Sequence, residues 1–191
     1  MELSLYLFRT GKVKSKENIF LGWINAPLEK KGISEAKVVA KKLKNKNIGV
    51  AFCSDQIRGK QALAQVMKYH KNSKIIIDPR LRERNYGIFS GHEKELFKKY
   101  FKNYPEIHRG YNANIPRGES LVDVSKRVFP FMKELMKFMQ SEKVNVVICA
   151  HTNSMRAIGE YLEDLPEEHA INIENSPSDY KKYVLKFDFL C

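Results

Sequence analysis

Short apolar runs alternate with longer amphipathic stretches along this 191-residue chain, and this alternation constrains its fold more than any other feature. The apolar runs cover residues 3–8, 50–53, 75–77 and 144–150, and an alternating run covers 183–189. The stretches with apolar residues at helical spacing cover 34–44, about 63–70, 120–139 and 154–162. Because strands that alternate with helices favour a sheet layered between helices, we predict a three-layer α/β/α fold with a mostly parallel central sheet.

Local signals refine this prediction. The run 3–8 is apolar on both faces except at Ser4, which is typical of a central strand covered on both sides. We expect Gly32 to supply the turn before the helix at 34–44. After Asp78-Pro79, the chain is polar, aromatic and rich in turn residues, with a helical stretch around 93–101. We therefore predict one domain over 1–191, with a lid-like excursion beside the sheet at about 80–118.

The composition disfavours several classes of protein. No apolar run approaches the roughly 20 residues that cross a bilayer, and the N-terminal run lacks the basic segment of a signal peptide, so we expect a cytoplasmic protein without a membrane partner. The cysteines show no CxxC spacing and the histidines no metal-binding spacing, so we expect no disulfide framework, no metal and no cofactor. The cysteines are Cys53, Cys149 and Cys191.

The net charge of +12 favours anionic partners, which include nucleic acid, acidic membrane surfaces and phosphorylated metabolites. Lysines such as Lys37 and Lys41 lie in helical stretches, where we interpret them as a solvated helix face. Nucleic acid is disfavoured because the chain has no helix-turn-helix pattern and no basic aromatic platform. A homo-oligomer and a non-catalytic basic interaction protein remain open alternatives.

Charged side chains follow the predicted strands at one edge of the sheet. In open α/β sheets, ligands bind beyond the carboxyl ends of the strands, which here are 9–11, 54–58, 82–83 and 151–153. Two arginines, a carboxylate and a histidine converge there if the topology is correct. Arginine forks pair with phosphate oxygens, and a carboxylic acid can protonate a leaving alkoxide. The sequence therefore predicts a site for a phosphate ester.

Several segments together resemble the histidine phosphatase superfamily and, within it, the cofactor-dependent phosphoglycerate mutases. These segments are Arg9-Thr10-Gly11, Phe20-Leu21-Gly22-Trp23, Gly32-Ile33-Ser34-Glu35-Ala36, 54–58, 81–91, Gly118-Glu119-Ser120 and 150–156. In such enzymes a histidine attacks phosphorus and becomes a phosphohistidine. The resemblance implies the same α/β fold and a small phosphorylated acid, such as phosphoglycerate, as the ligand.

The resemblance also implies a role for individual residues. Arg9 and Arg58 correspond to the phosphate clamps, Glu83 to the proton donor and His151 to the second histidine of the site. The substrate contacts of the mutases map onto Gly22, Tyr86, Lys94, Arg109 and Asn153. Lys94 and Arg109 would suit a carboxylate as well as a phosphate.

The chain departs from the family pattern on the ligand side. Thr10 stands at the position of the nucleophilic histidine, Leu21 replaces a small hydroxyl residue, and Thr152 replaces a glycine. Because a hydroxyl is a weak nucleophile until a base removes its proton, we predict that binding is retained while mutase activity is lost or impaired. The alternative is an active mutase or phosphatase that uses an unorthodox nucleophile or direct attack by water. A nucleophile relocated to His92 or His108 is disfavoured because loops position reacting groups poorly.

Overall fold

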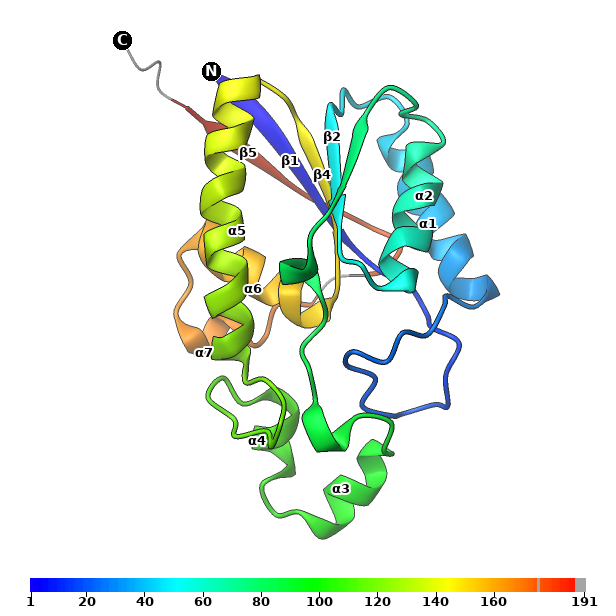
Figure 1. Ribbon diagram of the computed structural model, residues 1–191, viewed down its shortest axis with the longest axis vertical. Coiled ribbons are helices and arrows are strands. Elements are labelled where there is room, and N and C mark those ends of the chain that lie inside the picture. Colours follow the sequence, from blue (N-terminus) through cyan, green and yellow to red (C-terminus); the bar gives the residue numbers. More distant parts are fainter. Residues whose placement is uncertain (175, 188–191) are drawn as a thin grey trace.

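The computed structural model describes residues 1–174 and 176–187, and its centre is one five-stranded sheet (Figure 1). The strands are β1 (Glu2–Arg9), β2 (Val50–Cys53), β3 (Lys74–Ile77), β4 (Val146–Ala150) and β5 (Lys181–Lys186), in the order β3-β2-β4-β1-β5. Neighbouring strands are parallel except for β5, which runs antiparallel to β1. The predicted α/β/α fold with a mostly parallel sheet is confirmed.

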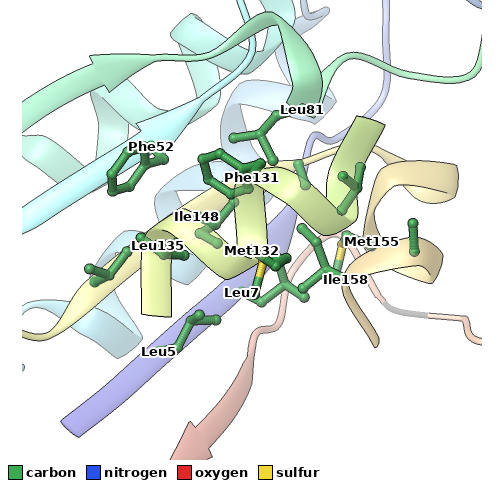
Figure 2. Close-up of a cluster of buried hydrophobic side chains, with 14 of the residues drawn as sticks. Leu5, Leu7, Phe52, Leu81, Phe131, Met132, Leu135, Ile148, Met155 and Ile158 are labelled. Carbon is green, nitrogen blue, oxygen red and sulfur yellow. The ribbon is translucent and has the colours of Figure 1, made fainter. Parts of the chain in front are cut away.

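Helices cover both faces of the sheet, as Figure 1 shows. One layer contains α1 (Lys30–Leu43) and α2 (Ile57–Met67), and the other contains α5 (Leu121–Glu142) and α6 (Thr152–Glu163). Strand β1 serves both layers because alternate side chains point to opposite faces. Leu5 and Leu7 pack with Met132 of α5 (Figure 2), whereas Tyr6 and Phe8 belong to the cluster under α1 and α2. Burial on both faces explains why the run 3–8 is apolar almost throughout.

The structure corrects the expected role of Gly32. Helix α1 begins at Lys30, so Gly32 lies inside its first turn and not in a turn before it. The residue is buried against Lys12, and a Cβ added to it would overlap the Lys12 carbonyl oxygen. Gly32 therefore permits a close approach of helix and loop, a requirement that depends on tertiary packing and leaves no periodic signal.

Other boundaries shift by a few residues. Strand β4 begins at Val146, two residues after the start of the predicted run, and α6 begins at Thr152 because His151 is its N-cap. The last strand occupies Lys181–Lys186. The predicted end of that strand at 188–189 lies outside the described residues, as does Cys191.

The segment between β3 and α5 begins with a 3₁₀ turn at Pro79–Leu81, which packs on α5 and places Leu81 in the main core (Figure 2). The rest of the segment forms a separate cluster beyond the carboxyl ends of the parallel strands (Figure 1), with a 3₁₀ turn at Gly87–Phe89 followed by α3 (Lys94–Tyr100) and α4 (Tyr104–Arg109). Helix α3 confirms the helical stretch predicted around 93–101. The cluster has its own aromatic core, which Phe20 joins from the loop after β1. This packing holds α3 and α4 over one end of the sheet.

A short helix, α7 (Glu167–Ala170), and a connection to β5 follow α6. Within the described part of the chain, none of the helices combines the length and the apolar character needed to cross a membrane.

Candidate functional site

The register of the sheet brings three strand ends together. Arg9 pairs with Ala150 across β1 and β4, and Cys53 pairs with Cys149 across β2 and β4. The residues that follow these strands therefore meet at one edge. A cavity of about 590 Å³ lies there. All ten predicted site residues line it: Arg9, Thr10, Gly22, Arg58, Glu83, Tyr86, Lys94, Arg109, His151 and Asn153.

His151 is the buried centre of this edge, with 1% of its surface exposed. Its Nε2 lies 2.7 Å from Ser54 Oγ, and Arg58 Nε donates to its Nδ1 at 3.3 Å. Because Nδ1 accepts, the proton of the neutral ring belongs on Nε2. Burial, assisted by the positive charge of Arg58, lowers the pKa of His151 to about 3. The imidazole is therefore neutral near pH 7.

Thr10 extends directly from β1, and its backbone N–H donates to the Ala150 carbonyl at 3.0 Å. Its hydroxyl oxygen lies 3.4 Å from His151 Nδ1, within reach of that nitrogen. The lone pair on Nδ1 already accepts a hydrogen bond from Arg58. A base whose pKa is about 3 is also poorly matched to removing a proton from an alcohol. This geometry does not make Thr10 a strong nucleophile.

The two arginines present different donors to the cavity. Arg58 is 2% exposed and donates to the carbonyls of Ile24 and Gly22 at 2.8 and 2.7 Å. Arg9 donates from Nη1 to Thr152 Oγ1 at 3.0 Å, while its buried Nε has no hydrogen-bond partner among the described residues. A buried donor without an acceptor is costly, so an anion in the cavity would relieve that cost at Arg9.

Glu83 is held by donors from two segments. Its Oε1 accepts from the backbone N–H of Arg84 at 2.8 Å and from both nitrogens of Asn153 at 3.0 Å. Burial alone would raise the pKa of Glu83, but the positive charge of Arg58 and these hydrogen bonds help to lower it. The carboxyl is thus ionised near pH 7. A dianionic phosphate would oppose that ionisation and move Glu83 towards the protonated form.

The other end of the cavity is formed by residues from α3, α4 and α6. Lys94 Nζ lies 5.8 Å from the centre of the Phe20 ring, and burial lowers the pKa of this lysine. Arg109 forms an ion pair with Glu174 at 3.0 Å. Burial, with the positive charges of Lys94 and Arg109, lowers the pKa of His108 to about 4. This end combines several cations with a neutral imidazole.

Several lining or supporting residues were absent from the predicted site. Arg156 lines the cavity and had a signal, because it closes the motif at 150–156. Ser54 also had a signal, since it follows a predicted strand directly. Glu174 had none, because it lies in the connection between α7 and β5, where no periodicity marks it. Exposed His92 does not line this cavity, whereas His108 does.

The donor set suits phosphate chemistry. Arg9 and Arg58 can hold an anion, and the neutral His151 and the carboxyl of Glu83 lie beside it, so the cavity combines anion-binding donors with a group that can exchange a proton. Among the side chains that the structure describes, no group of three or more histidine, cysteine, aspartate or glutamate residues is arranged to hold a metal ion.

Comparison with known proteins gives a consistent result. The profile of the histidine phosphatase superfamily (branch 1) matches residues 5–187. A 2,3-bisphosphoglycerate-dependent phosphoglycerate mutase from Methanococcus vannielii is 32% identical, and the alignment covers 90% of this chain and 86% of that protein.

Solved structures share the fold. The α-ribazole phosphatase from Shigella flexneri has a TM-score of 0.82 at 21% identity, covering 94% of this chain and 89% of its own. A mycobacterial glucosyl-3-phosphoglycerate phosphatase, solved in complex with inorganic phosphate, has a TM-score of 0.78 at 22% identity and covers 90% and 84%.

Proposed function

We propose, because this chain belongs to the histidine phosphatase superfamily, that its cavity binds a small phosphorylated acid while covalent phosphoryl transfer is lost or heavily impaired. The observation that carries the proposal is the contrast within one cavity. Arg9, Arg58 and His151 are positioned around it, but the residue that extends β1 into it is Thr10. In this proposal, the cavity keeps the two arginines that would hold phosphate but lacks the histidine nucleophile on which the family's chemistry depends.

Binding of the phosphoryl group uses donors already in place. Arg58 is fixed by two backbone carbonyls, and Arg9 has a buried N–H that lacks an acceptor. A phosphate dianion would accept from both guanidinium groups and would raise the pKa of His151, so that this ring could also donate. The site therefore loses little conformational entropy when it binds phosphate.

Covalent transfer is the step that fails in this account. An imidazole at position 10 would attack phosphorus with an unshared ring nitrogen, whereas the Thr10 hydroxyl must first lose a proton. The neighbouring His151 is a weak base, and Arg58 already donates to its free nitrogen. Removing a nucleophile in other enzymes lowers turnover by several orders of magnitude while binding and electrostatic effects persist.

A slow phosphatase reaction is the second candidate, and Glu83 favours it. Water would attack phosphorus, the bond from phosphorus to the ester oxygen would break, and protonated Glu83 would give its proton to the leaving alkoxide. The products would be inorganic phosphate and an alcohol. This route uses the same two arginines to hold the phosphate and requires no nucleophilic side chain at position 10.

The ligand class follows from the relatives and from the cations at the far end of the cavity. The relative described above is a phosphoglycerate mutase, and Lys94 and Arg109 suit a carboxylate. We therefore expect 3-phosphoglycerate to bind, with the excursion at 80–118 covering it as a lid.

Calorimetric titration with 3-phosphoglycerate, combined with a phosphate-release assay, tests the proposal. We expect saturable binding that Arg9→Gln removes and that Arg117→Gln, an exposed control, retains. We expect turnover near background. Robust turnover that His151→Ala abolishes and Thr10→Ala leaves unchanged would contradict the loss of activity and support the attack by water.

A further inference from the structure

The far end of the cavity carries positive charge with an unusual carboxylate beside it. Lys94, Arg109 and Arg156 lie close enough to His108 for their charges to act on its ring. Glu174 approaches this group from a different part of the chain and forms its 3.0 Å ion pair with Arg109. Both members of the pair line the cavity. The Glu174 carboxylate of the protein itself therefore pairs with Arg109, a cation that lines the cavity.

Glu174 is brought there by contacts of the preceding residue. Arg156 Nε, on α6, donates to the Ile173 carbonyl at 3.3 Å. The Ile173 side chain packs on Gly159, where an added Cβ would come within 2.6 Å of Ile173 Cδ1. Gly159 and Arg156 thus hold this connection against α6, and Glu174 then reaches Arg109 of α4. The position of the carboxylate is set by packing on one helix, while its partner belongs to another.

The ion pair itself is exposed, and this limits its structural value. The side chains of Arg109 and Glu174 are 48% and 68% exposed. Exposed ion pairs contribute little to stability because water and salt screen them. Arg156, in contrast, is buried in the wall of the cavity. An anion from solution that replaced Glu174 would leave Arg109 paired and would add favourable interactions with the less exposed cations nearby.

We propose that the Glu174 carboxylate occupies the position beside Arg109 that the substrate's second anionic group takes when it binds. A ligand with such a group therefore displaces Glu174 from Arg109. The ligand class is a phosphate ester that carries a carboxylate at its other end, and Glu174 and Arg109 together set the preference for it. The inference rests on the proposed function, because it assumes that the ester phosphate lies between Arg9 and Arg58.

A matched pair of ligands tests this directly. 3-Phosphoglycerate and glycerol 3-phosphate have the same carbon chain and phosphate but end in a carboxylate and a hydroxymethyl group, respectively. Each is titrated calorimetrically into the wild-type protein, Glu174→Gln and Arg109→Gln. Glu134→Gln is the control, because Glu134 also forms an exposed ion pair with an arginine, Arg80, and lies outside the cavity.

The two variants should act in opposite directions on one ligand. We expect wild-type protein to prefer 3-phosphoglycerate by roughly tenfold or more, as a charged hydrogen bond would give. Glu174→Gln should raise the affinity for 3-phosphoglycerate about two- to fivefold by removing an internal competitor. Arg109→Gln should lower it, while glycerol 3-phosphate affinity and the Glu134→Gln control stay within error of wild type.

The remaining outcomes distinguish a failure of the inference on Glu174 from a failure of the proposed function. If Glu174→Gln and Arg109→Gln weaken binding alike, the pair is merely structural and the inference is wrong. Equal affinity of the wild-type protein for both ligands also overturns it, while the proposed function stands. Failure of both ligands and of inorganic phosphate to bind the wild-type protein would instead contradict the proposed function.

Discussion

Arg58 and Arg109 line the same cavity, yet they are held in opposite ways. Arg58 is 2% exposed and is fixed by the carbonyls of Gly22 and Ile24, next to strand ends whose register the sheet determines. The Arg109 side chain is 48% exposed and pairs with a carboxylate that has even more contact with water. One end of the cavity is therefore built into the fold. We call the other end adjustable, because its ion pair is exposed and contributes little to the stability of the core.

The largest expected effect concerns the fixed end. Thr10→His should raise turnover of 3-phosphoglycerate by about a thousandfold or more, because in the proposed function the site keeps its phosphate-binding groups and lacks only a nucleophile. Turnover is measured by release or transfer of phosphate. Thr10→Gln, which adds bulk without a nucleophilic nitrogen, should show no gain. An inactive Thr10→His variant that still binds ligand would show that the end of β1 does not position residue 10 for attack on phosphorus.

Stability should separate the two arginines. Arg58→Gln should lower the free energy of unfolding by about 3 kcal/mol, because the buried carbonyl of Gly22 and the partly buried carbonyl of Ile24 lose a charged donor. Arg109→Gln should change it by less than about 1 kcal/mol, as exposed ion pairs do. Urea denaturation measures both. Similar losses for the two variants would break the distinction between a fixed end and an adjustable one.

The buried histidine predicts a pH dependence of stability. The pKa of His151 is about 3 in the folded chain, below the value of about 6.5 for an unfolded histidine. The unfolded chain therefore binds more protons below pH 6.5, and stability falls as the pH drops from there towards 3. His151 alone should account for about 2 kcal/mol of the stability lost between pH 7.5 and pH 5, at 1.4 kcal/mol per pKa unit.

Urea denaturation at these two pH values measures this loss. It should be smaller by that amount in His151→Gln. It should be unchanged in His92→Gln, which alters an exposed histidine outside the cavity. Identical pH dependence in wild-type protein and His151→Gln would mean that His151 does not carry the effect.

The smallest effect concerns Thr152, whose hydroxyl accepts from Arg9 at 3.0 Å. Thr152→Ala should strengthen the binding of inorganic phosphate about two- to fivefold, because a freed donor of Arg9 then gains an acceptor from the ligand. Thr152→Ser keeps the hydroxyl and should behave like wild type in calorimetry. Weaker binding in Thr152→Ala would mean that the hydroxyl positions Arg9 and does not compete for it.

The same contrast explains how far the sequence could predict the molecule. The strands and the cavity at their carboxyl ends were predictable, because two-sided burial leaves an apolar run such as 3–8 and parallel strands end at one edge. The contacts of Ser54 and Thr152 depend on strand register, which the periodicity of one strand does not contain. The predicted role of Gly32 is wrong because this position must be a glycine to let the loop at Lys12 approach the helix, and the local sequence does not contain that contact. Glu174 was missed because its place depends on the packing of Ile173 on α6.

The most direct test of the central claim is a search for a covalent phosphoenzyme. Wild-type protein and Thr10→His are incubated with 2,3-bisphosphoglycerate, quenched in alkali and measured by intact mass spectrometry. Binding of 3-phosphoglycerate is titrated in parallel. The account predicts binding without a phosphoenzyme for the wild-type chain, and a phosphohistidine at position 10 in Thr10→His. A phosphoenzyme on the wild-type chain, whether on Thr10, His108 or His151, would contradict it.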